Sequence, residues 1–192
     1  GAPEIAIGSI AEFPGYMAYV VAANSSVHSI DDLRGKKIGI TSPGSLTDWL
    51  AEELDRVKGW SGEGDRLTKV TVGGSTPAVI AALKTGAVDA SITSTQLGLQ
   101  MGENGEGRLL FDCSAYVGTI ELYTMFASKT IAEHNPDAVR RFLAAWYETV
   151  DFMKTHKAES VAISAKVMGH TPAVESQVYD RLIGRLSSNG KF

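Results

Sequence analysis

The sequence KIGITSPGSLT, residues 37–47, predicts a buried strand, a tight turn and the start of a helix. Its isoleucines alternate with small residues as in a core strand, and Pro43 and Gly44 then break the strand. Ser45 can cap the helix that follows. The first N–H groups of a helix have no partner inside it, and the helix dipole adds positive potential there. The stretch therefore predicts an anion-binding site that needs no lysine or arginine.

Two similar turns, rich in glycine and hydroxyl side chains, follow the strands expected at residues 67–72 and 88–92. Repeated strand, turn and helix units predict a mostly parallel sheet with helices on both faces. Ligands of such sheets bind at the carboxyl ends of the strands, where these turns lie. The candidate ligand-binding residues of the turns are Ser42, Gly44, Ser45, Thr47, Gly74, Ser75, Ser94 and Thr95. The alternative is that small polar residues are simply the residues that turns use.

Composition limits the class of protein. The chain has 192 residues, enough for one sizeable domain or two small lobes that share a sheet. A net charge of −4 without a lysine or arginine cluster argues against binding to nucleic acid. The sequence contains no apolar run of about 18 residues that would span a membrane, and no signal peptide. Cys113 is the single cysteine, which excludes an internal disulfide and a cysteine-built metal site.

The residues do not form a motif typical of catalysis. The histidines are far apart in the sequence, and none lies in a strand-end turn. Neither a nucleophile elbow nor a zinc-ligand spacing is present. A serine nucleophile usually needs a neighbouring base, so we interpret Ser42 and Ser45 as hydrogen-bond donors. The apolar stripe of the long helix expected at residues 136–156 is interpreted as core. We expect no enzyme activity, no cofactor and no metal.

Three signatures in the chain resemble those of periplasmic solute-binding proteins of ABC transporters. The first is IDDLRGKKIGI followed by SPGS, at residues 30–40 and 42–45. The second is AALKTGAVDA at residues 81–90, and the third is NPDAVRRF at residues 135–142. The most similar branch contains the sulfonate, nitrate and taurine receptors and the NMT1/THI5-like proteins. The resemblance covers about residues 3–186, with the signatures in the expected order.

The resemblance implies an α/β fold of the type II periplasmic-binding-protein class, with two lobes joined by two crossing strands. Residues 1–23 would form a remnant of lobe 1 and the first crossing strand, expected at residues 17–23. Residues 24–120 would form lobe 2, and residues 121–192 the second crossing strand and the C-terminal helices of lobe 1. The N-terminal part of lobe 1 is missing by comparison with the family. Tyr16, near the first crossing, would cover a ligand or pack at the hinge.

The resemblance also implies the function of a solute-binding receptor of an ABC importer. Such a receptor would capture a small anionic or zwitterionic molecule between its lobes, of the sulfonate, nitrate, taurine or thiamine-precursor class, and deliver it to a membrane permease. Its expected location is periplasmic or extracytoplasmic, with or without a lipid anchor. Two alternatives stay open. They are the effector-binding domain of a transcription regulator, and an NMT1/THI5-like pyrimidine-synthesis enzyme, whose cysteine-rich metal motif this chain lacks.

Overall fold

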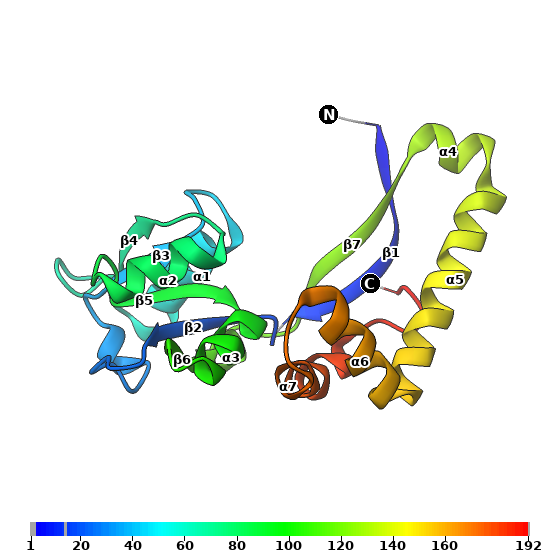
Figure 1. Ribbon diagram of the computed structural model, residues 1–192. Coiled ribbons are helices and arrows are strands. Elements are labelled where there is room, and N and C mark those ends of the chain that lie inside the picture. The colour runs from blue at the N-terminus through cyan, green and yellow to red at the C-terminus, as the bar shows by residue number, and fades with distance from the viewer. Residues whose placement is uncertain (1–2, 14, 192) are drawn as a thin grey trace. The chain divides into compact units, whose positions relative to one another are not determined.

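The computed structural model describes residues 3–13 and 15–191. The chain divides into two units (Figure 1). Unit 2 is the continuous segment 14–118, and unit 1 combines residues 1–13 with residues 119–192. Each unit is described by itself.

Unit 2 is built around a sheet that has five strands among the described residues, in the order β4-β3-β5-β2-β6. The strands are β2 (Met17–Ala22), β3 (Lys37–Ile40), β4 (Thr68–Thr71), β5 (Ala90–Ser94) and β6 (Gly107–Asp112). β3 pairs in parallel with β4 and β5, whereas β2 pairs antiparallel with β5 and β6. The mostly parallel sheet expected from the sequence is therefore present, with β2 as its reversed strand.

Helices cover both faces of this sheet. They are α1 (Leu46–Lys58), α2 (Thr76–Lys84) and α3 (Thr95–Glu103), and two short 3-10 turns lie at η1 (Asp31–Leu33) and η2 (Cys113–Ala115). Val20 of β2 packs in one core cluster with residues of α2 and α3, including Leu83 and Met101. Its neighbour Tyr19 points to the opposite face because side chains alternate along a strand. On that face Tyr116, which lies edge-on to the Tyr19 ring, donates its hydroxyl proton to the Leu50 carbonyl of α1 over 3.0 Å.

The first unit boundary lies at a different place from the one expected. Residues 17–23 were expected to cross between lobes, but β2 lies inside the sheet of unit 2, which begins at residue 14. The physical reason is the run of four buried residues from Ala18 to Val21. Such a run needs cover on both faces, and a strand in the middle of the sheet provides it. Unit 2 ends at Gly118, close to the expected residue 120.

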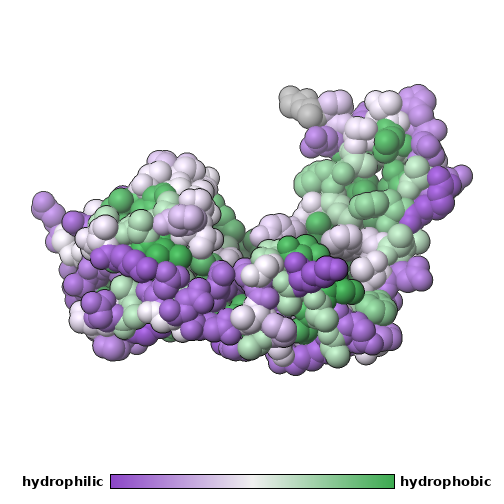
Figure 2. Space-filling view, in the orientation of Figure 1, coloured by the Kyte–Doolittle hydropathy of each residue, from purple (hydrophilic) through white to green (hydrophobic). Residues whose placement is uncertain are grey.

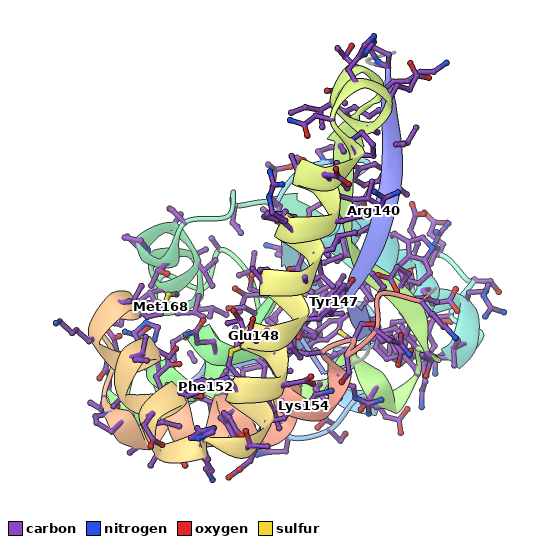
Figure 3. The ribbon with its side chains drawn as sticks, turned by 90° about the vertical axis from the view of Figure 1, so that its right-hand side faces the viewer. Arg140, Tyr147, Glu148, Phe152, Lys154 and Met168 are labelled. Carbon is purple, nitrogen blue, oxygen red and sulfur yellow. The ribbon has the colours of Figure 1, made fainter. Side chains whose placement is uncertain are left out.

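Unit 1 contains the antiparallel pair β1 (Glu4–Phe13) and β7 (Ile120–Ser128), which we call the β1–β7 ribbon. Its helices are α4 (Lys129–His134), α5 (Pro136–Thr155), α6 (Lys157–Met168) and α7 (Pro172–Leu182), followed by the 3-10 turn η3 (Ile183–Arg185). The long amphipathic helix expected at residues 136–156 is α5, and Tyr147 joins it to the ribbon (Figure 3). The Tyr147 hydroxyl donates to the Ser9 carbonyl over 2.9 Å. No helix in the described part of the chain is both long and apolar enough to cross a membrane.

The packing of α3 on the sheet of unit 2 can be tested with a pair of glycine substitutions. A Cβ at Gly98 would lie 2.9 Å from Val20 Cγ1 and 3.4 Å from Leu109 Cβ, whereas a Cβ at Gly102 would have no neighbour nearer than 4.0 Å. We expect Gly98→Ala to lower the free energy of unfolding by about 1–3 kcal/mol through overpacking. Gly102→Ala should leave it unchanged or raise it by up to about 1 kcal/mol. Urea unfolding measures both, and equal stabilities would contradict this packing.

Candidate functional site

The three strand-end turns of unit 2 border a common hollow of about 190 Å³. Each turn contributes residues to its wall, and two strands and α2 add apolar side chains. The lining residues are Met17, Thr41, Thr47, Gly73, Gly74, Val79, Ile92, Thr93 and Ser94. The structure thus brings together the turns after β3, β4 and β5, at the carboxyl ends of these strands.

The residues proposed from the sequence are only partly in this wall. Thr47, Gly74 and Ser94 line the hollow. The expected residues outside the wall are Tyr16, Ser42, Gly44, Ser45, Ser75 and Thr95. Sequence reasoning missed Thr41 and Thr93, although each is next to a polar turn already singled out. The signal that would have found them is their place at the very end of a strand, where ligands of α/β sheets bind.

The start of α1 is already occupied by a carboxylate of the chain itself. The Gly44 N–H donates to Asp48 Oδ2 over 2.7 Å, and the Asp48 N–H donates to Ser45 Oγ over 3.3 Å. Asp48 Oδ1 also lies 2.6 Å from Lys69 Nζ on β4. An acidic residue is favoured in the first turn because it faces the positive end of the helix dipole. The expectation that the Gly44 N–H is open to an anionic ligand is therefore wrong.

The hydroxyl groups at this turn hold the strand end to the helix. Thr47 is buried, and its Oγ1 accepts the Thr41 N–H over 2.8 Å and lies 2.9 Å from Ser45 Oγ. Ser45 acts as the helix cap that the sequence predicted. These bonds keep Thr41 and Thr47 together at the wall of the hollow, so the Ser45 and Thr47 hydroxyls have a structural role.

The two hydroxyl side chains in the turn between β5 and α3, Ser94 and Thr95, have different roles. Ser94 caps α3 by accepting the Leu97 N–H over 3.2 Å and lies at the wall of the hollow. Thr95 is only 1% exposed, and its hydroxyl donates to the Gly15 carbonyl over 2.6 Å. The Thr95 N–H donates to the Tyr16 carbonyl over 2.9 Å. Thr95 therefore fastens the start of β2 to the sheet and does not reach the hollow.

The start of α2 differs from that of α1 because its first turn contains no acidic residue. The Ser75 side chain makes no capping hydrogen bond, and proline occupies the beginning of the helix. Gly73 has a φ of 78°, a conformation that favours glycine. A Cβ on Gly74 would lie 3.6 Å from Thr41 Cγ2, so the missing side chain keeps this part of the wall open. The positive end of the α2 dipole thus has no carboxylate of its own turn to neutralise it.

The wall of the hollow is uncharged, since its described lining residues include neither acidic nor basic side chains. Among the residues that the structure describes, no group of three or more histidine, cysteine or acidic residues could hold a metal ion. The arrangement can therefore bind a small polar or anionic group through hydroxyls, backbone N–H groups and a helix dipole.

The single thiol lies in the core of unit 2, away from this wall. Cys113 is fully buried, and burial raises its pKa to about 12. Its sulfur lies 3.5 Å from the Tyr116 hydroxyl. A thiol with this pKa is protonated at neutral pH, so it is not an activated nucleophile.

The carboxylate at the start of α1 predicts a pH dependence of stability. The Lys69 ammonium, followed by the Gly44 N–H, holds the pKa of Asp48 below its usual value of 3.8. A carboxyl group whose pKa is lower in the folded chain than in the unfolded chain stabilises the fold at pH values above its unfolded-state pKa. This stabilisation is lost as the pH falls through the folded-state pKa. We expect the stability difference between the wild type and Asp48→Asn to shrink as the pH falls below about 4. Urea unfolding from pH 7 to pH 3 measures it, and a constant difference would contradict the assignment.

Solved structures share the fold of this chain. The periplasmic aliphatic sulphonate binding protein SsuA of Escherichia coli has 24% identity and a TM-score of 0.72, with 95% of this chain and 60% of that chain covered. The alkanesulfonate-binding protein SsuA of Xanthomonas axonopodis pv. citri, bound to MOPS, has 22% identity and a TM-score of 0.73, with 95% and 61% covered. The desulfurization enzyme DSZB has 16% identity and a TM-score of 0.67, with 98% and 69% covered.

These identities are low, so the likeness shows the fold, which is the periplasmic-binding-protein fold predicted from the sequence. The chain spans about 60% of the length of the two sulfonate-binding proteins. A search among curated proteins finds no match. The family model described as NMT1/THI5 like matches residues 1–160. The chain therefore belongs to the NMT1/THI5-like family.

Proposed function

We propose that this chain is the solute-binding receptor of an ABC importer and that it captures a small anionic or zwitterionic molecule. The observation that carries the proposal is the hollow of unit 2, which all three strand-end turns line with hydroxyls and glycines. The family and the fold shared with sulfonate-binding proteins support it. The candidate ligands are sulfonates, nitrate, taurine and thiamine precursors.

The chemistry of the wall supports a ligand with one compact acidic group. A volume of about 190 Å³ corresponds to roughly six water molecules at about 30 Å³ each, which suits a sulfonate, nitrate or carboxylate head. Thr41 and Thr93 line the hollow, and their hydroxyls would act as donors together with the N–H groups of the turn that leads through Gly73 and Gly74 into α2. Without a lysine or arginine in the wall, the helix dipole supplies the positive potential. This arrangement favours one negative charge over several.

The hollow supports capture without chemistry. A hydroxyl becomes a nucleophile when a base takes its proton, and none of the chain's histidines lines the hollow. His28 lies 3.2 Å from an Arg108 nitrogen, and His170 pairs with Glu175 over 2.7 Å in unit 1. The hydroxyls in the wall therefore serve as hydrogen-bond partners. The alternatives of a regulator domain and a pyrimidine-synthesis enzyme stay predictions.

Transport would follow from a shift in conformation. A ligand that binds one conformation more tightly raises the population of that conformation. The ligand-bound conformation would be the one that the membrane permease recognises, on the extracytoplasmic side of the membrane. The receptor then needs no reaction of its own, because release to the permease completes its task.

The proposed ligand class predicts which compounds stabilise the folded chain. We expect taurine, methanesulfonate or nitrate to raise the melting temperature by about 3–6 °C at about ten times the dissociation constant. Choline at the same concentration and ionic strength should have no such effect. Differential scanning fluorimetry followed by isothermal titration calorimetry measures both. Stabilisation by choline alone, or by none of the compounds, would refute the proposal.

The wall of the hollow predicts the effect of one added methyl group. Gly74→Ala places a Cβ near Thr41 and narrows the hollow without a backbone clash. We expect it to weaken binding of the stabilising compound about tenfold, which corresponds to about 1.4 kcal/mol. Gly102→Ala, at the far end of α3, is the matched control and should bind like the wild type. Calorimetric titration measures the affinity of both variants for the compound. Equal affinities of Gly74→Ala and Gly102→Ala would show that the ligand does not bind at this wall.

A further inference from the structure

A cluster of three charged residues lies at the beginning of α1. Asp48 and Glu52, one helical turn apart on α1, each place a carboxylate oxygen 2.6 Å from Lys69 Nζ on β4. The Asp48 side chain is 13% exposed and the Lys69 side chain 30%, so water only partly screens this ion pair. We call the three residues the Lys69 cluster. Two carboxylates share one ammonium, which leaves the cluster with one net negative charge.

Hydrogen bonds connect this cluster to the wall of the hollow. The Asp48 N–H donates to Ser45 Oγ over 3.3 Å, and Ser45 Oγ lies 2.9 Å from Thr47 Oγ1. Thr47 Oγ1 also accepts the Thr41 N–H over 2.8 Å. Thr41 and Thr47 both line the hollow. Asp48 is thus the direct neighbour of a wall residue in the sequence and is linked to the wall through one serine, so its charge acts on the hollow at short range.

The charge of the cluster exceeds the charge of the helix start that it faces. The start of a helix carries the equivalent of about half a positive charge. At α1 this half charge offsets only part of the net negative charge of the Lys69 cluster, so this side of the hollow stays negative. The start of α2 lies on the other face of the sheet and has no acidic residue in its first turn. A single negative charge is therefore attracted to α2, whereas the wall offers no positive group to a second one.

We propose that the Lys69 cluster sets the charge selectivity of the hollow, with Asp48 as the residue through which the chain accepts a compact monoanion and rejects a dianion of the same shape. This inference rests on the proposed function, because it concerns the ligand of the same hollow. Methanesulfonate and sulfate are suitable probes. Both are tetrahedral and of similar size, but sulfate has a second negative charge where methanesulfonate has a methyl group.

Removal of one charge at a time tests the proposal. The wild type should bind methanesulfonate more tightly than sulfate. Asp48→Asn keeps an oxygen that can accept the Gly44 N–H but makes the cluster neutral, so the ratio of the sulfate to the methanesulfonate dissociation constant should fall about threefold to tenfold. Lys69→Gln leaves two carboxylates without a cation, and this ratio should rise. A structural disturbance of the turn would change both dissociation constants alike and leave their ratio unchanged.

Two further variants make the test specific. Figure 2 shows hydrophilic residues on much of the visible surface of unit 2, so a control for general surface charge is needed. Glu63→Gln removes the same charge from the loop between α1 and β4, at the opposite end of the parallel strands, and should keep the wild-type ratio. Glu52→Gln removes a 52% exposed carboxylate one turn beyond Asp48 and should lower the ratio as Asp48→Asn does.

Isothermal titration calorimetry at constant ionic strength and neutral pH measures both dissociation constants for each variant. The same ratio in the wild type, Asp48→Asn, Glu52→Gln and Lys69→Gln would overturn the inference and leave the proposed function intact. An equal fall of the ratio in Glu63→Gln and Asp48→Asn would also overturn it, because the effect would then come from total charge. A wild-type chain that binds neither anion would refute the proposed function, and this inference with it.

Discussion

The burial of β2 on both faces is the constraint on which unit 2 depends. Four consecutive residues of β2 are buried, so helices must cover both sides of the strand. α2 and α3 cover the face of Val20, and α1 lies on the face of Tyr19. β3 pairs in parallel with β4 and β5, so the carboxyl ends of these three strands lie at one edge of the sheet. The hollow lies where the turns after these parallel strands meet.

The position of one carboxylate then decides which part of the hollow can bind an anion. The Asp48 carboxylate accepts a hydrogen bond from the Gly44 N–H and forms an ion pair with Lys69. It therefore neutralises the positive end of the α1 dipole. The first turn of α2 has no acidic residue, and Gly74 leaves its wall open. The same local rule, that helix starts attract negative charge, thus excludes α1 and favours α2 as the anion-binding end.

The sequence predicted the fold class, the strand-turn-helix units and the meeting of the three turns, because apolar periodicity and turn residues report local structure directly. It did not predict the residue at which unit 2 begins. That boundary depends on the pairing of β2 with β5 and β6, which lie far along the chain. Nor did it predict that Asp48 would occupy the α1 start or that Thr95 would bind the Gly15 carbonyl. Those hydrogen bonds depend on side-chain geometry that the spacing of residues in the sequence does not specify.

Backbone chemical shifts can show whether the start of α2, and not the start of α1, binds the ligand. Titration of taurine or methanesulfonate into ¹⁵N-labelled protein would report which N–H groups meet the ligand. We expect the largest shifts at residues 73–76 and at Thr93, with little change at Gly44, whose N–H donates to Asp48. The largest shifts at residues 44–48, or throughout unit 1 with none at the start of α2, would contradict this expectation.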